Sequence, residues 1–369
     1  MEKKQGTLGL REFFAMTILM IGAKLSDDTP SILYDSLLNA AWMVPIISGI
    51  LSAIPLYLLF KVMSKHENKN LHDINLALLG RFLGYSVSFI LWLIGSFAII
   101  TDTRGYVDII STMYFINTPP IAIYAVLMVV CAYGAKKGIQ HIGSVAYVLI
   151  FYVKAVLLIA FIFAILDSSF NHIFPIWGPG QWEIVKESTQ KVSIFADLLF
   201  LALIAPYLTS VKEFKKGTWA ALIFLIFELA FSFLIYVLIF DYMPVQSLNY
   251  PYHEMIRYIE VGNFLTKVET FFLPLWLIAA FVRFSAYLYL NAVLFGGLFK
   301  IKQFELAIPA LATTFLFFGL LPETPAITTF VLRETLLNLT SPLFILMPIL
   351  LWVAALVRGE FKNGKKENL

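Results

Sequence analysis

Long apolar runs separated by short polar segments dominate the pattern of this chain. A membrane helix needs about 20 mostly apolar residues, and ten runs fit this length. They cover roughly 10–38, 42–62, 82–112, 119–135, 140–166, 192–211, 217–241, 266–298, 304–321 and 330–357. Segments such as "KHENKNLHD", "AKKG" and "KEFKKG" separate them. The pattern predicts an all-α membrane protein with ten transmembrane helices, the first of them broken.

Composition supports a membrane protein and excludes several functions. Hydrophobic residues make up 60% of the chain and charged residues 14%, whereas a soluble domain carries about 25% charged residues. The single cysteine, Cys131, excludes an internal disulfide and a cysteine-based metal site. The sequence has no dinucleotide loop, P-loop, HExxH zinc motif or nucleic-acid patch. No nucleophile and base pair up at membrane depth, so we expect no enzyme, no cofactor and no metal.

The basic residues predict the orientation in the membrane. An even number of spans puts both termini on one side, and Lys and Arg favour the cytoplasmic side. Eighteen of the 27 Lys and Arg fall on the side of the termini and four inside spans, which leaves five outside. Those five are Lys186, Lys191, Arg257, Lys267 and Arg333. We therefore expect cytoplasmic termini, and residues 3 and 4 precede an uncleaved anchor.

The first span contains a polar interruption. In "IGAKLSDDTPSIL", residues 21–33, a glycine, a lysine, two aspartates and a proline stand where the helix should continue. Backbone groups without partners are tolerated in a membrane only where they line a cavity. We therefore interpret the stretch as a helix break, with Pro30 near the start of the second half. The alternative is that the span ends at Lys24 and "KLSDDTP" is an exposed outer loop.

A second interruption lies in the sixth span, "VSIFADLLFLALIAPYLTSV". Pro206 removes one helical hydrogen bond and frees a carbonyl near Ala202. Breaks in spans one and six of ten are typical of transporters built from two inverted repeats. We expect a single domain, 1–369, with a first repeat over 10–166 and a second over 192–357.

The longest outer loop contains a short amphipathic pattern. In "PYHEMIRYIEVG", Tyr252, Met255, Ile256 and Ile259 share one face of a helix that begins at Pro251. The pattern predicts a helix over 251–263 on the outer surface. An unstructured loop with accidental periodicity is the alternative.

Three stretches carry a resemblance to a known family. They are "LREFF…IGAK", "FPIWGPG" and "YPYHEMIRYIEVGNFLTKVETFFLPLWLIAAF". The chain resembles the B subunits of spore germinant receptors, endospore germination permeases of the amino acid–polyamine–organocation superfamily. Where the family has a Glu-Arg-x-Glu-like element, this chain has Thr266-Lys267-Val268-Glu269 and keeps only the last acid and a basic residue.

The resemblance implies a fold, a location and partners. It implies a five-plus-five inverted-repeat fold, the LeuT type, in the inner spore membrane. It implies detection of a small nutrient, such as an amino acid, and assembly with an A subunit and a lipoprotein C subunit. A proton-coupled amino acid permease needs the same cavity and stays open as the alternative function.

Several residues inside the spans are candidates for the site. We expect ligand contacts from the two breaks and from the third span, whose position beside the cavity the resemblance implies. They are Gly22, Ala23, Lys24, Asp102, Tyr106, Ala202 and Pro206. The resemblance also places Lys154 of the fifth span and Ser285 of the eighth at a proton or cation site. A structural Lys154 tied to carbonyls is the alternative.

The remaining charges have simpler interpretations. Lys24 can pair with Asp27 or Asp28, and Arg104 with Asp108 one helical turn away. Glu228 and Arg283 are a candidate pair inside the membrane, and Asp197 and Glu269 are interpreted as solvated charges at the outer entrance. All five histidines fall in loops or at span ends, so we interpret them as surface residues. Two tryptophans and two tyrosines are interpreted as interfacial aromatics: Trp177, Trp182, Tyr250 and Tyr252.

Overall fold

The computed structural model describes residues 8–259 and 269–361. Four predicted features lie outside these residues: the basic pair at 3 and 4, the end of the outer helix at 260–263, Thr266–Val268, and the basic tail from 362. The α-helices are α1 (Leu10–Gly22), α2 (Thr29–Leu37), α3 (Val44–Met63), α4 (Leu71–Ile109), α5 (Pro120–Lys137), α6 (Ile139–Leu166), α7 (Gln181–Gln190), α8 (Asp197–Phe200), α9 (Val211–Phe240), α10 (Tyr242–Ser247), α11 (Pro251–Tyr258), α12 (Glu269–Phe299), α13 (Ile308–Gly319) and α14 (Glu334–Val357).

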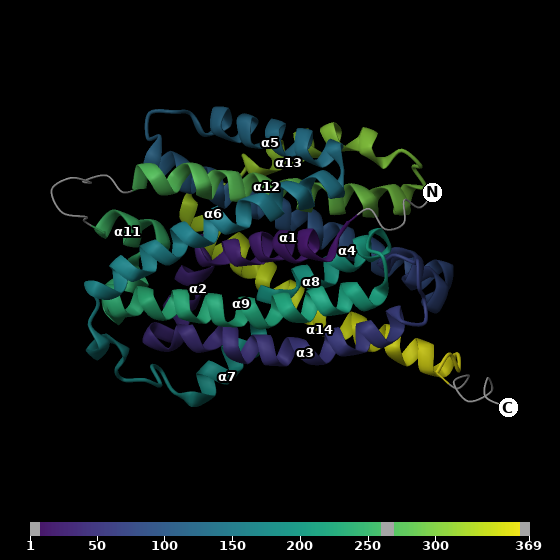
Figure 1. Ribbon diagram of the computed structural model, residues 1–369, viewed down its shortest axis with the longest axis horizontal. Helices are drawn as coiled ribbons and strands as arrows, with labels where there is room; N and C mark the ends of the chain where they lie inside the picture. Colours follow the sequence, from purple (N-terminus) through teal and green to yellow (C-terminus); the bar gives the residue numbers. More distant parts are fainter. Residues whose placement is uncertain (1–7, 260–268, 362–369) are drawn as a thin grey trace.

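Tighter and wider helical turns connect or extend these helices. The 3₁₀ segments are η1 (Ala23–Leu25), η2 (Leu38–Met43), η4 (Phe170–Ile173), η5 (Val192–Phe195), η6 (Leu201–Tyr207) and η7 (Phe304–Ala307). Two π-helical segments, η3 (Ile110–Tyr114) and η8 (Ile327–Arg333), extend the ends of α4 and α14. The long helices run roughly side by side in one bundle (Figure 1).

The expected membrane spans are helical. Seven helical segments in the described part of the chain are long and apolar enough to cross a membrane. The bent pair Gln181–Gln190 and Val192–Tyr207 makes eight when it counts as one span. The remaining two expected spans contain the shorter helices α1 and Phe304–Gly319. The start of α1 and the end of α14 lie at the same end of the bundle (Figure 1), as an even number of spans requires.

Burial separates central from peripheral helices. In the apolar window of α12, 83% of the residues are buried inside the protein, compared with 22% in α6. α12 is therefore surrounded by other helices, whereas α6 turns most of its side chains toward lipid. Side chains at the centre of the bundle come mainly from α1, α4, α12 and the segments around α8.

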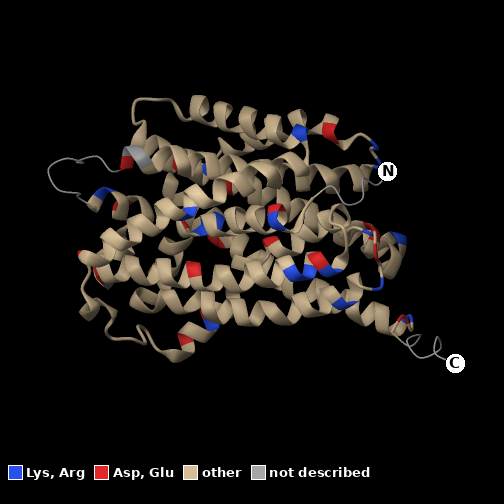
Figure 2. Cartoon of the chain, viewed as in Figure 1, with Lys and Arg blue, Asp and Glu red and all other residues tan. Residues whose placement is uncertain are grey.

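Charged residues outside the spans are distributed unevenly. Figure 2 shows Lys and Arg concentrated at the end of the bundle where α1 begins and α14 ends, with few at the opposite end. A smaller group of charges lies near the middle of the bundle, among apolar helices (Figure 2). That inner group contains the candidate site.

Candidate ligand site at two helix breaks

The first break is present where the sequence predicts it. α1 ends at Gly22, one 3₁₀ turn follows, and α2 begins at Thr29 with Pro30 in its first turn. Asp27 Oδ1 accepts a hydrogen bond from the backbone N–H of Thr29 at 2.8 Å. Lys24 is only 3% exposed. The alternative of an exposed outer loop is therefore wrong.

Side chains already satisfy carbonyls that the break frees. Ala23 O accepts from Ser26 Oγ at 2.9 Å, and Leu25 O accepts from the Tyr236 hydroxyl at 2.9 Å. Ser26 O pairs with His253 Nε2 at 3.1 Å. These main-chain groups therefore already have partners inside the protein.

The second break meets the first. The segment Val192–Tyr207 consists of two 3₁₀ turns on either side of the four-residue helix α8. Lys24 Nζ donates to Ile194 O at 2.6 Å and to Asp197 Oδ2 at 2.5 Å. The predicted pairing of Lys24 with Asp27 or Asp28 is wrong. Asp197, which we interpreted as a solvated entrance charge, is 8% exposed and holds the two breaks together.

Seven buried charged residues form a cluster around the breaks. Arg283 of α12 donates to Asp27 Oδ2 at 3.1 Å and to Asp102 Oδ2 of α4 at 2.7 Å. Arg333 of η8 contacts the same two aspartates, and its Nε lies 3.5 Å from Asp28 Oδ1. We call this set the central cluster: Lys24, Asp27, Asp28, Asp102, Asp197, Arg283 and Arg333. The predicted pair of Glu228 with Arg283 is therefore wrong.

The charges of the central cluster do not balance. Its three cations face four carboxylates, so the fully ionised cluster carries one excess negative charge. Each member is less than 9% exposed. An uncompensated buried charge costs several kcal/mol, on the order of what breaking a buried ion pair costs. The cluster therefore favours one additional positive charge, such as a proton or the amine of a ligand.

A small cavity lies against the Lys24–Asp197 pair. We call it the ionic cavity; its lining residues include Lys24, Asp102, Asp197, Tyr287 and Arg333. The Tyr287 hydroxyl donates to Asp197 Oδ1. The cavity measures about 30 Å³, which holds roughly two or three waters. Ligand pockets usually exceed about 300 Å³, so an amino acid fits here only after the flanking helices separate.

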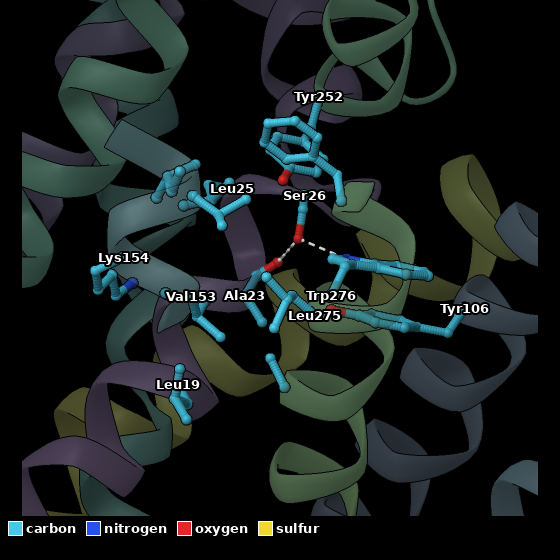
Figure 3. Close-up of a pocket in the computed structure, with 15 residues that line it drawn as sticks. Leu19, Ala23, Leu25, Ser26, Tyr106, Val153, Lys154, Tyr252, Leu275 and Trp276 are labelled. Atoms are coloured by element: carbon cyan, nitrogen blue, oxygen red, sulfur yellow. Dashed lines mark hydrogen bonds between the residues drawn. The ribbon is translucent and has the colours of Figure 1, made fainter. Parts of the chain in front are cut away.

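A second cavity lies on the other side of the first break (Figure 3). We call it the aromatic cavity; it measures about 50 Å³, and Gly22, Ala23, Tyr106 and Lys154 are among its lining residues. Trp276 stacks on Tyr106 with ring centroids 4.6 Å apart and an angle of 2°. Its Nε1 donates to Ser26 Oγ at 3.0 Å, as the dashed line in Figure 3 marks. Tyr106 also accepts a hydrogen bond from Arg283 Nη1 at 3.4 Å, so the aromatic pair lines this cavity and contacts the central cluster.

The outer helix α11 covers the first break. His253 is 1% exposed, and besides Ser26 O its ring contacts the Tyr114 hydroxyl, 2.8 Å from Nδ1. Burial lowers the pKa of His253 to about 3, so the ring is neutral at ordinary pH. The surface interpretation is wrong for this histidine and for His72, which is 5% exposed. Tyr252 is also buried, whereas Trp182 is 74% exposed.

Lys154 pairs with Glu228 beside the first break. The Lys154 ammonium donates to Glu228 Oε1, and the other carboxylate oxygen has no hydrogen-bond partner among the described residues. A Cβ added to Gly22 would lie 2.8 Å from that oxygen and 3.3 Å from Lys154 Nζ. Ser285 lies elsewhere: it lines a surface groove with Gly134 of α5. The two residues predicted to share a site do not share a cavity.

The other candidate residues differ in how close they lie to the cavities. Ala202 and Pro206 belong to η6 and line neither the ionic nor the aromatic cavity. The predicted pair of Arg104 with Asp108 is confirmed at 2.9 Å. Arg333, which the charge count placed outside although the predicted last span 330–357 contains it, ends η8 and lies buried in the cluster. Its position directly after the apolar run "FVL" of that span was the missed signal.

Known proteins resemble this chain over most of its length. The family described as "Spore germination protein" matches residues 10–327. Spore germination protein KB of Bacillus subtilis (strain 168) is 24% identical over 308 residues, 82% of this chain and 81% of its own. Spore germination protein A2 of the same strain is 23% identical over 370 residues, 97% of this chain and 99% of its own. GerLB of Bacillus cereus is 24% identical over 306 residues, 80% of each chain.

Solved structures resemble the fold. A crystal structure of a mutant of the Eremococcus coleocola manganese transporter superimposes with a TM-score of 0.61 at 13% identity, covering 100% of this chain and 92% of the transporter. Its complex with an aromatic bis-isothiourea compound gives a TM-score of 0.56 at 13% identity, covering 95% and 82%. The chain therefore has the predicted transporter fold, with broken helices in its first and sixth spans.

Proposed function

The chain belongs to the family of spore germination proteins, and we propose that it is the nutrient-sensing subunit of a spore germinant receptor, with an amino acid as its ligand. Family members carry names of germination proteins, and the fold is that of a transporter. A transporter fold used for sensing retains a solute site between its broken helices. The proposal therefore concerns what binds at the two breaks and how binding is transmitted.

The observation that carries the proposal is the Lys24–Asp197 ion pair. It joins the two breaks at 2.5 Å and lines the ionic cavity. An amino acid carries the same two charges, so its carboxylate can take the place of Asp197 at Lys24 while its ammonium takes the place of Lys24 at Asp197. A zwitterionic amino acid has no net charge, so this exchange leaves the excess negative charge of the central cluster unchanged.

Exchange of this ion pair separates the two breaks. While Lys24 and Asp197 bind each other, the segments around them are held at ion-pair distance. A ligand inserted between them lengthens this connection and favours a different arrangement of the first and sixth spans. In this proposal the two repeats, 10–166 and 192–357, move relative to each other. The Lys154–Glu228 pair, which touches Gly22, senses the change as the proton or charge site.

Partners and location follow from the family. We propose that the subunit assembles with an A subunit and a lipoprotein C subunit, which read the movement of its helices. The proposed location is the inner spore membrane with both termini in the cytoplasm. The concentration of Lys and Arg at the end of the bundle where α1 begins and α14 ends supports this orientation (Figure 2).

Thermal unfolding of the purified protein against a panel of amino acids, sugars and nucleosides tests the proposal. A ligand at 100 times its Kd stabilises the folded state by about 2.7 kcal/mol. We expect stabilisation by one or more amino acids in the wild type and its loss in Asp197→Asn. Lys186→Gln, a change at an exposed residue, serves as control. Stabilisation by sugars or nucleosides alone, or an unchanged response of Asp197→Asn, refutes the proposed ligand.

The fold favours a second candidate, a proton-coupled amino acid permease. Its supporting observation is the Lys154–Glu228 pair, a lysine and an acid with side chains 21% and 7% exposed, beside the first break. Uptake of a labelled amino acid into vesicles that contain this protein alone distinguishes the two functions. Uptake that depends on a proton gradient supports the permease, and binding without uptake supports the receptor.

A further inference from the structure

A deep groove runs along the outside of the bundle, away from the candidate site. α1 lies between α6 and α9 (Figure 1), and residues of these three helices line the groove. It measures about 490 Å³. Its walls are aromatic and aliphatic, with Phe14 from α1, Tyr147 and Phe151 from α6, and Phe224 from α9. It is therefore far larger and more apolar than either cavity at the breaks.

The groove opens toward lipid rather than toward the protein interior. Phe151 is 64% exposed and Phe224 is 42% exposed, and both belong to membrane-spanning helices. Small residues make the groove deep: Ala15 and Gly217 let α1 and α9 approach closely, since a Cβ on Gly217 would lie 2.7 Å from Phe13. An apolar groove of this size inside a bilayer is filled by hydrocarbon chains, since water has no partners there.

One end of the groove is basic. Arg11 in the first turn of α1 and Lys216 near the start of α9 both line it, and both are exposed. Neither has a carboxylate within 4.0 Å in the described part of the chain. Arg11 lies in the first turn of α1, which begins at the end of the bundle where most Lys and Arg gather (Figure 2), and we assign this end to the level of the lipid headgroups.

The other end of the groove reaches the candidate site. From Lys216 to Phe224, α9 rises about 12 Å, which takes the groove almost to the middle of the bilayer. There Lys154 lines both the groove and the aromatic cavity. A chain that fills the groove therefore contacts the residue that pairs with Glu228 next to Gly22.

We propose that this groove is a specific site for an anionic phospholipid of the membrane. Its phosphate binds Arg11 and Lys216, and one acyl chain fills the groove between α6 and α9 as far as Lys154. Two free cations at the headgroup level select an anionic lipid over a neutral one, and the aromatic walls hold the chain. The proposal does not depend on which nutrient the protein senses, or on whether it senses one.

Native mass spectrometry of the full-length protein tests the site. The protein is released from nanodiscs that contain equal amounts of phosphatidylglycerol and phosphatidylcholine with identical chains, and the retained lipid is counted. Each basic contact with an anionic lipid contributes about 1 kcal/mol, which is about 5-fold in affinity, so two contacts give about 30-fold. We expect one retained phosphatidylglycerol, preferred about 30-fold over phosphatidylcholine. Equal retention of the two lipids by the wild type overturns the proposal.

Two variants and a matched control identify the groove. Arg11→Gln with Lys216→Gln should abolish the preference, whereas Lys136→Gln with Lys212→Gln removes two exposed charges outside the groove and should keep it. Ala220→Trp fills the groove and should remove the retained lipid even with both cations present. Loss of preference in the control pair, or its survival in the first pair, overturns the site. If free glycerol phosphate displaces the lipid, the headgroup alone is sufficient for binding, and this result also overturns the proposed lipid site.

Discussion

The ion pair between Lys24 and Asp197 allows an asymmetric prediction. Replacing Lys24 by Met leaves two cations against four carboxylates in the central cluster, so the excess negative charge doubles. Replacing Asp197 by Asn leaves three cations against three carboxylates, so the excess disappears. Both changes break the same contact. They should nevertheless lower the free energy of unfolding by different amounts, because one increases the excess buried charge and the other removes it.

The magnitudes follow from burial and partners. The side chains are 4% and 11% exposed, and removing one partner of a buried pair costs about 3–5 kcal/mol. We expect Lys24→Met at the upper end of this range. Asp197→Asn keeps oxygen acceptors for Lys24 and Tyr287, so its loss should be about 1–2 kcal/mol, the cost of weakened hydrogen bonds. The double variant restores the wild-type excess of one negative charge and should be more stable than Lys24→Met alone.

Detergent-induced unfolding in mixed micelles, followed by tryptophan fluorescence, measures these differences. The exposed pair Lys186–Glu183, with side chains 47% and 44% exposed, is the matched control. Its disruption should change the free energy of unfolding by less than about 1 kcal/mol. Equal losses in Lys24→Met and Asp197→Asn would refute the charge count. A loss in Lys24→Met no larger than in the control would refute the buried pair itself.

Three further predictions concern the surroundings of the break. Gly22→Val adds a branched side chain where a Cβ would already lie 2.8 Å from Glu228 Oε2 and 3.3 Å from Lys154 Nζ, so it should weaken ligand stabilisation; unchanged affinity contradicts this. Lys154→Met leaves Glu228 unpaired and should lower the free energy of unfolding by about 3–5 kcal/mol. The double variant Lys154→Met/Glu228→Gln should recover part of this loss. A double variant as unstable as the single one argues against the pair. The folded-state pKa of His253 is about 3, below the unfolded value of about 6.5, so its neutral form contributes fully to the free energy of unfolding above pH 6.5. This free energy should fall by about 1.4 kcal/mol per pH unit as the pH decreases from 6.5 toward 3. His253→Gln should flatten this slope, whereas His141→Gln, a change at an exposed residue, should not.

The spans and breaks could be predicted because they depend on local sequence. Bilayer thickness sets the length of an apolar run, and Pro30 with its polar neighbours interrupts one. Pro206 lies in the other break, which the structure resolves into 3₁₀ turns on either side of α8. These signals depend on the chemistry of consecutive residues. Hydropathy and proline therefore sufficed for the fold class.

The partners of the buried charges could not be predicted because they depend on tertiary contacts. Lys24 has two aspartates within four residues but pairs with Asp197, 173 positions away. Arg283 selects Asp27 and Asp102 rather than Glu228. Which acid meets which base depends on how the helices rotate and cross, and helical periodicity does not fix this.

Burial outside the spans was also underestimated. His253 lies in a loop segment of the sequence, yet α11 folds over the first break and the ring pairs with Ser26 O. Ser285 was assigned to the site of Lys154 through a resemblance, but the structure places it on the surface groove beside Gly134. A family resemblance gives the helix on which a residue lies, whereas the cavity it lines depends on its rotation.

The central claim is tested most directly by comparing how the wild-type protein binds an amino acid and two analogues, each of which lacks one of its two charged groups. The analogues are the corresponding amine, which lacks the carboxylate, and the corresponding carboxylic acid, which lacks the ammonium. If the ligand replaces both halves of the Lys24–Asp197 pair, isothermal titration should show binding of the amino acid and at least 100-fold weaker binding of each analogue. Comparable affinity for either analogue would contradict exchange of the ion pair as the way this protein recognises its nutrient.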